Sequence, residues 1–244
     1  MTALPIMTTS TTTPTPKKPE TLLDKINAQV SQPLSWLVAI ACLAPLTVLV
    51  YQTITDNATA NPIQYLTIQT GKIALILLVL SLACTPIVTV TNWKTATKVK
   101  RALGLYGFLY VCVHFGVFVF DNGLLDGMID AAAVVGAIVE KRFAIAGFLA
   151  FCLLIPLAIT STKGWQKRLG KRWKKLHRLV YLIVPIAVLH FAWLVKSIVV
   201  RPEPIAWGVV VALLLIARIP RVRKSLTDFR ARYARFANAS RPAR

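Results

Sequence analysis

The stretch "GKRWKKLHRLVYLIVPIAVLHFAW", residues 170–193, decides the class of fold. It begins as a dense basic run and continues as an apolar run of the length that crosses a bilayer, since about 20 apolar helical residues span the hydrocarbon. The same stretch carries His177 and His190, two of the three histidines in the chain. An ionisable side chain inside a membrane helix is costly and usually marks a functional site or an internal partner. The stretch therefore predicts a transmembrane helix that carries part of a site.

The rest of the chain repeats the apolar pattern. Of its 244 residues, 56% are hydrophobic and only 16% are charged, with a mean hydropathy of +0.61, whereas a soluble domain is about 25% charged. We therefore predict an all-α integral membrane protein, a six-transmembrane helix bundle. The predicted spans are residues 34–54, 71–91, 102–120, 143–161, 177–196 and 204–219.

The net charge of +20 predicts the orientation of the bundle. Lysine and arginine number three in the N-terminal tail, four between the second and third spans, eight between the fourth and fifth, and nine from Arg218 onward, which is 24 of the 29. All 24 fall on one side of the predicted membrane. Cytoplasmic loops retain Lys and Arg, so both termini are expected in the cytoplasm. The charge reports topology, and no nucleic acid is expected as a partner.

These features divide the chain into three parts. Residues 1–33 are expected to form a disordered, basic N-terminal tail, because their Thr- and Pro-rich beginning has almost nothing to bury. Residues 34–219 form the six-helix domain, and residues 220–244 form a basic cytoplasmic C-terminal tail. The first apolar run is longer than a signal-peptide core, so it is expected to remain as an anchor.

The basic segment 163–178, "KGWQKRLGKRWKKLHR", has a helical pattern of its own. Trp165, Leu169, Trp173 and Leu176 recur at spacings of four, four and three, which would align them as an apolar stripe beside six or more cations. This pattern favours an interfacial helix on anionic lipid headgroups. The alternative is a docking face for an anionic donor cofactor or a protein.

Depth arithmetic relates two of the three histidines. His114 lies 12 residues, or ~18 Å, along the third span, and His190 lies 13 residues, or ~20 Å, along the fifth, when both are counted from the basic end. The two imidazoles can therefore meet at one level in the outer half of the bilayer. Two imidazoles at equal depth, surrounded by apolar residues, suit a b-type haem whose iron takes one nitrogen from each.

His177 lies at the basic end and has no histidine at its level, where the third span offers Lys100 and Arg101. A second bis-histidine haem would therefore need help from another chain. His177 could bind a second haem with a ligand other than histidine, serve an electron-donor site, or be a boundary histidine in a basic loop. On an ideal helix it also lies ~140° around the axis from His190, so the two are not expected on one face.

At these residues the chain resembles the MsrQ (YedZ) family, the haem-binding membrane subunit of the periplasmic protein methionine sulfoxide reductase system, which has a ferric reductase-like transmembrane domain. The resemblance runs from about residue 70 to 200. It is carried by "TGKIALILLVLSLACTP", "RALGLYGFLYVCVH", "AITSTKGWQKRLGKRWKKLHRLVYL" and the histidine 13 residues after His177. The resemblance implies that His114, His177 and His190 are the haem-iron ligands.

The resemblance also implies a direction of electron flow. Electrons would pass from the quinol pool or a reduced flavin such as FMN, through haem b, to a periplasmic molybdopterin reductase that reduces methionine sulfoxide in oxidised proteins. The chain would then be an electron-transfer subunit in the inner membrane, without substrate chemistry of its own. Only 25 residues follow the last span, where related ferric reductases carry a flavin and nicotinamide domain. We therefore expect electrons to come from a separate molecule.

Two other classes of function remain at this stage. A transporter or proton channel could use the histidines as a proton relay, although no Asp or Glu falls inside any predicted span. A membrane scaffold would make the histidines incidental. A metal-free, colourless purified protein with proton flux in vesicles would favour the transporter or channel.

Overall fold

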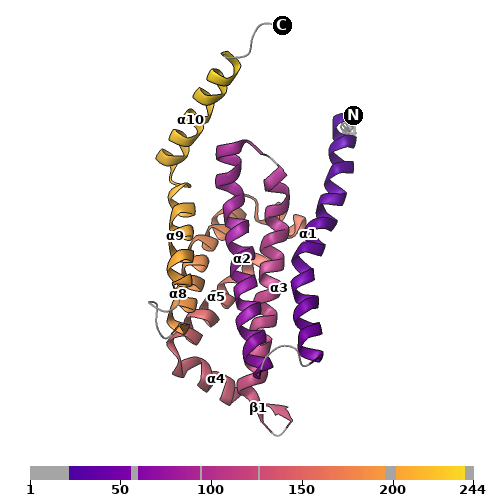
Figure 1. Cartoon of the computed structure of the whole chain (residues 1–244), viewed down its shortest axis with the longest axis vertical. Helices are drawn as coiled ribbons and strands as arrows, with labels where there is room; N and C mark the ends of the chain where they lie inside the picture. Colours follow the sequence, from indigo (N-terminus) through magenta and orange to yellow (C-terminus); the bar gives the residue numbers. More distant parts are fainter. Residues whose placement is uncertain (1–21, 56–59, 94, 126, 196–201, 240–244) are drawn as a thin grey trace, which may run out of the picture.

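The computed structural model describes residues 22–55, 60–93, 95–125, 127–195 and 202–239. Within these residues the chain forms a bundle of long helices, with one short two-stranded hairpin at one end (Figure 1). The all-α membrane architecture predicted from the sequence is confirmed: five helices are long and apolar enough to cross a bilayer, or six if a bent pair is counted as one span. The parts of the two tails at 1–21 and 240–244 lie outside the described residues.

The first three helices form one side of the bundle. They are α1 (Leu22–Ile54), α2 (Pro62–Thr91) and α3 (Thr95–Gly123). Helix α1 begins at Leu22 and so extends into the segment for which a disordered tail was expected. Asn61 caps the start of α2 by accepting a hydrogen bond from the Gln64 amide, and Asn92 ends it in a left-handed conformation, which allows the close turn into α3.

The hairpin and one short helix lie at the end of the bundle where α3 finishes. Strand β1 (Leu124–Leu125) pairs antiparallel with β2 (Met128–Ile129), and α4 (Ala131–Glu140) follows. Asp130 caps α4 by accepting a hydrogen bond from the Ala132 amide. This end also contains the start of α5 (Arg142–Ile159), and we call it the outer end because the sequence predicts it to be periplasmic.

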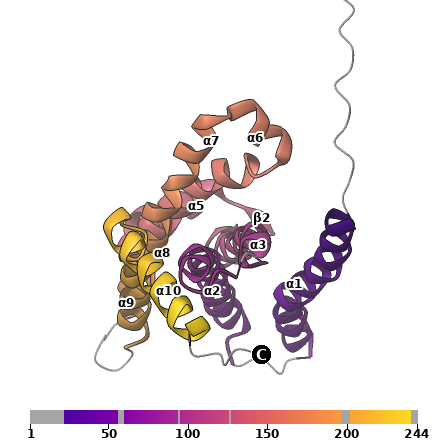
Figure 2. The same cartoon turned by 90° about the horizontal axis from the view of Figure 1, so that it is seen from above.

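The basic segment 163–178 differs from the single amphipathic helix that was expected. It forms two short helices, α6 (Lys163–Leu169) and α7 (Lys171–Leu176), separated at Gly170, whose φ of 50° lies in the region that favours glycine. The break removes the continuous apolar stripe. Trp173 instead turns inward and donates a hydrogen bond from Nε1 to the Thr160 carbonyl. Figure 2 shows α6 and α7 projecting from the side of the bundle beside α5.

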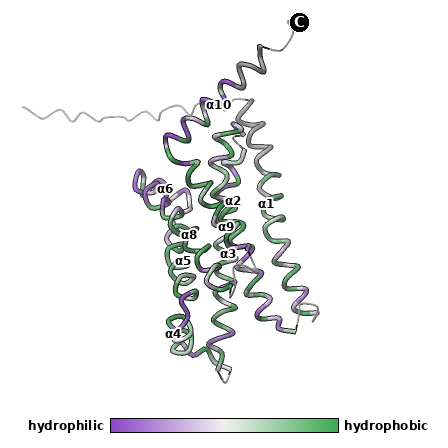
Figure 3. Tube along the Cα trace, turned by 60° about the vertical axis from the view of Figure 1, so that its left-hand side comes forward, coloured by the Kyte–Doolittle hydropathy of each residue, from purple (hydrophilic) through white to green (hydrophobic). Residues whose placement is uncertain are grey.

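The last part of the chain returns through the bundle and then bends away. A short 3₁₀ turn, η1 (His177–Leu179), leads into α8 (Val180–Leu194), and α9 (Glu203–Ile216) and α10 (Pro220–Ala239) follow. The sixth predicted span is therefore short: α9 has 14 residues and bends by 79° into α10. The helices of the bundle are mainly hydrophobic, whereas hydrophilic residues are frequent in α6 and in the coloured part of α10 (Figure 3).

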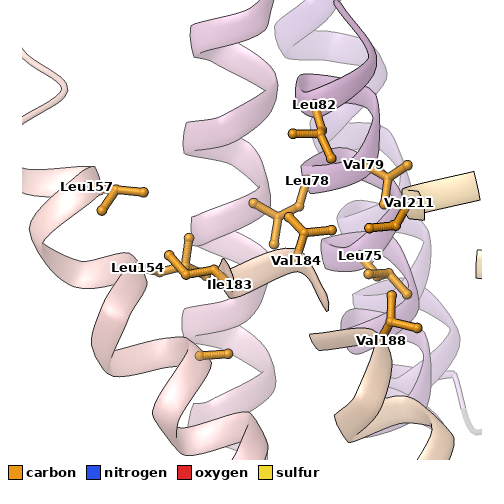
Figure 4. Close-up of a cluster of buried hydrophobic side chains, with 11 residues drawn as sticks. Leu75, Leu78, Val79, Leu82, Leu154, Leu157, Ile183, Val184, Val188 and Val211 are labelled. Carbon is orange, nitrogen blue, oxygen red and sulfur yellow. The ribbon is translucent and has the colours of Figure 1, made fainter. Parts of the chain in front are cut away.

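A hydrophobic core joins the two halves of the bundle. Leu82 of α2 and Ile183 and Val184 of α8 are almost completely buried. Figure 4 shows these side chains interdigitating with Leu78 of α2 and Leu154 of α5. The core holds α2, α5 and α8 at fixed positions, and these helices carry most of the site described next.

Candidate functional site

His114 of α3 and His190 of α8 face each other inside the bundle. Their ring centroids are 6.0 Å apart and their planes are nearly perpendicular, at 83°. The two histidines are separated by 76 positions in the sequence, and they meet because they lie at a common level in their helices, as the sequence predicted. The structure thus brings together two of the three histidines that the sequence singled out.

Each imidazole is fixed by a backbone carbonyl of a neighbouring helix. Nδ1 of His114 lies 2.8 Å from the Thr67 carbonyl oxygen of α2, and Nδ1 of His190 lies 2.6 Å from the Phe143 carbonyl oxygen of α5. A carbonyl can only accept a hydrogen bond, so Nδ1 must carry the proton in both rings. In the neutral form the remaining nitrogen, Nε2, then has a free lone pair, which is the form in which histidine binds a metal.

Glycines make room for both rings. A Cβ atom at Gly147 would lie 2.7 Å from Nδ1 of His190, and one at Gly71 would lie 3.0 Å from Cε1 of His114. Any other residue at Gly147 would force the ring to move. The two half-sites have the same construction, because in each the glycine follows the anchoring carbonyl by four residues and precedes the histidine by 43.

Two adjoining cavities are lined by both histidines. Their walls are almost entirely apolar, as is required to shield a macrocycle from water. Thr67, His114, Gly147, His190 and Leu194 line both cavities. The first cavity is also lined by Ile68, Gly71, Lys72, Ala74, Leu75, Leu78, Val111, Ala150, Phe151, Leu154, Ala187 and Phe191, and the second by Phe115, Phe118, Ile138, Phe143, Ala144 and Phe148.

This arrangement fits a metal held between the two rings. An imidazole nitrogen binds a metal at about 2.0 Å and lies roughly 1.1 Å from its ring centre, so opposed ligands have centroids about 6.2 Å apart. The observed separation is 6.0 Å. Two imidazoles supply only two ligands, so the other ligands of a metal held here would come from a bound group such as a porphyrin. Among the residues that the structure describes, no cluster of three or more His, Cys, Asp or Glu could hold a metal ion.

His177 does not join this pair. It lies in η1 near the basic end, where its ring stacks on the Trp173 indole with centroids 4.0 Å apart. Its Nδ1 lies 3.2 Å from the Trp173 carbonyl oxygen, and its buried Nε2 makes no hydrogen bond of ordinary geometry. No other histidine faces it among the residues that the structure describes, which agrees with the depth arithmetic.

One charged pair lies beside the cavities. Lys72, which lines the first cavity, forms an ion pair of 2.9 Å with Glu203 at the start of α9. Lys72, Gly71 and Gly147 were not among the site residues predicted from the sequence. An isolated glycine in an apolar helical run usually has a packing reason, and that signal would have pointed to both glycines.

Known proteins match most of this chain. The family described as "Ferric reductase like transmembrane component" matches residues 70–188. A protein-methionine-sulfoxide reductase heme-binding subunit MsrQ from Herminiimonas arsenicoxydans is 41% identical over 184 residues, which cover 75% of this chain and 83% of the relative.

Proteins of the same description from other bacteria are similarly close. The relative from Deinococcus radiodurans is 38% identical over 77% of this chain and 91% of its own length, and that from Caulobacter vibrioides is 38% identical over 78% and 88%. No solved structure matches the chain significantly.

Proposed function

Because this chain belongs to the MsrQ family of haem-binding subunits of protein-methionine-sulfoxide reductase, we propose that it is a haem b electron-transfer subunit. It is a multi-pass protein of the bacterial inner membrane. In this proposal it passes electrons from the quinol pool, or from a reduced flavin such as FMN, to a periplasmic molybdopterin reductase that repairs methionine sulfoxide in oxidised proteins. The observation that carries the proposal is the opposed pair of His114 and His190.

His114 and His190 are the proposed axial ligands. Their Nδ1 protons are held by the carbonyls of Thr67 and Phe143, which leaves Nε2 of each ring free to bind iron. A haem bound there would accept and release one electron at a time. The carbonyl contacts also fix the orientation of each ring, and such outer contacts make a ligating imidazole more basic.

The surrounding residues control access to the pair. Gly71 and Gly147 leave space beside the rings, and the apolar cavity walls exclude water from them. Exclusion of water and low local polarity are two of the factors by which a protein sets the reduction potential of a haem. The chain needs no acid, base or nucleophile for this task.

His177 is proposed either as a weaker ligand of a second haem or as a residue of the electron-donor site. Two features support both roles. His177 lies near the basic end, and its buried Nε2 has no hydrogen-bond partner of ordinary geometry. The positive-inside rule supports a cytoplasmic location for this end and for both termini. The cations of α6 and α7 would then contact anionic lipids.

Replacement of the histidines one at a time tests the proposal. Purified wild-type protein should show a reducible Soret band, and His114→Ala or His190→Ala should remove most of the haem of that site. His177→Ala is the matched comparison: it removes one of two haems if His177 is a ligand, or retains haem and slows reduction by a quinol if it belongs to the donor site. Full haem content in both the His114→Ala and His190→Ala proteins would refute the ligand assignment.

A further inference from the structure

Residues 121–140, which we call the outer cap, have an unusual charge. They comprise the end of α3, the β1–β2 hairpin and α4. This segment contains four of the nine acidic residues of the chain and no lysine or arginine, although the whole chain has a net charge of +20. The outer cap is therefore a locally acidic segment of a strongly basic protein, and its acids Asp121, Asp130 and Glu140 are exposed.

The outer cap also exposes large apolar side chains. Met128 and Ile129 in the hairpin are 76% and 62% exposed, and Val139 in α4 is 63% exposed. Figures 1 and 3 show the hairpin lying beyond the level at which α1 ends and α2 begins. The hairpin that carries Met128 and Ile129 therefore extends past the ends of these two helices. Exposed apolar groups with a polar rim are typical of protein-interaction sites.

The outer cap is attached to the wall of the histidine site. Ile138 of α4 lines the second cavity together with His114 and His190. Val134, on the same helix, is buried and packs against Gly123 at the end of α3. A molecule that docks on the outer cap would therefore come close to the histidine pair, with α4 between them.

We propose that the outer cap is the docking surface for a soluble reductase subunit, which would present a basic rim around an apolar centre. The inference rests on the function proposed above, which supplies the need for an electron acceptor on this side. The acidic groups would steer the partner during its approach, and the apolar tip would be buried in the complex. Lys141 and Arg142 follow the cap directly and mark its basic boundary.

Charge reversal at two exposed positions tests the docking surface. In Asp121→Lys combined with Glu140→Lys, both side chains are exposed and neither position lines a cavity with the histidines. Asp228→Lys is the matched control, because Asp228 is an exposed acid on α10 near the opposite end of the bundle. Each protein is reduced with dithionite, and the reoxidation of its haem by the purified oxidised reductase subunit is followed by stopped flow at low and at physiological salt.

At low salt the double variant should react at least about tenfold more slowly than the wild type. A factor of about ten is the smallest effect typical of electrostatic steering on association rates. Its rate should also depend less on salt, while the Asp228→Lys protein reacts like the wild type. Met128→Ser should weaken binding of the subunit without changing the salt dependence. The midpoint potential of each haem is measured in parallel, so that a changed driving force is not mistaken for a changed encounter.

The outcomes separate the docking inference from the proposed function. If wild-type haem reacts with the subunit and the double variant does so at the same rate and salt dependence, the outer cap is not the docking surface. If the wild type has no haem, or its reduced haem is not oxidised by the subunit, the proposed function itself is wrong. A slow double variant with normal haem content and potential supports both.

Discussion

Replacement of Gly147 by alanine should disturb the histidine site through a single added carbon. The new Cβ would lie 2.7 Å from Nδ1 of His190 and 2.8 Å from Cε1. Ordinary contacts begin at about 3.4 Å, so the ring would have to move by roughly 0.7 Å. The ring cannot move freely, because Nδ1 is held 2.6 Å from the Phe143 carbonyl oxygen, one turn earlier on the same helix as Gly147.

The magnitude follows from the cost of overpacking. An extra carbon in a well-packed interior costs about 1–3 kcal/mol, and each 1.4 kcal/mol is a factor of about ten in affinity. Haem should therefore bind about 5- to 150-fold more weakly to Gly147→Ala. A Cβ at Gly71 would lie 3.0 Å from His114, which requires a smaller movement, so Gly71→Ala should have a smaller effect.

Gly116→Ala is the matched control for these two variants. Gly116 lies two residues after His114 in α3, and a Cβ there would have no atom within 4 Å. Alanine is favoured over glycine within helices by about 1 kcal/mol, so this variant should retain its haem and unfold no more readily. The loss of haem affinity should decrease in the order Gly147→Ala, Gly71→Ala, Gly116→Ala. It is measured as haem per polypeptide and as the affinity of the apoprotein for added haemin. Wild-type affinity in Gly147→Ala would show that the ring position at His190 does not matter for haem binding.

Two further predictions concern the surroundings of the site. Lys72→Met should lower the midpoint potential of the haem and Glu203→Gln should raise it, because a positive charge near the site favours the reduced form. The Lys72 and Glu203 side chains are 34% and 51% exposed. Solvent therefore screens their charges, and each shift in a redox titration should stay below about 60 mV. Equal shifts of the same sign would rule out this charge effect. Tyr110→Phe should lower stability by about 1–3 kcal/mol, because the buried hydroxyl donates to the Cys42 carbonyl and holds α1 against α3. Thermal unfolding measures this loss, and unchanged haem content would distinguish it from damage to the site.

The spans and the pairing of His114 with His190 could be predicted because they depend on length and hydropathy. Apolar runs fix which residues cross the bilayer, and the rise of a helix then fixes the level of each histidine. The same arithmetic left His177 without a partner histidine, as the structure confirms. The sixth span, predicted as about 204–219, corresponds to α9, which ends at Ile216 where the chain bends by 79°, a feature that hydropathy does not report.

Other features depend on contacts that residue type does not encode. The carbonyls that hold the rings belong to Thr67 and Phe143, and every residue has a carbonyl. The break between α6 and α7 depends on the positive φ of Gly170, whereas the spacing of apolar residues continues through it. The two histidines proposed as ligands could therefore be predicted from the sequence, whereas the groups that orient them are visible only in the structure.

The two half-sites explain how one bound group could organise the whole bundle. His114 is anchored within the α2–α3 hairpin and His190 within the pair formed by α5 and α8, and each ring is oriented without help from the other half. Helices α5 and α8 meet α2 through apolar side chains such as Leu78 and Ile183. The last part of the chain adds directional contacts to α2, namely the Lys72–Glu203 ion pair and hydrogen bonds from Arg218 and Arg230 to carbonyls of α2. A metal bound by both rings would add a directional link between α3 and α8 beside the two cavities. Haem binding and the pairing of the two halves should therefore be coupled, since a ligand that binds only the folded state stabilises that state.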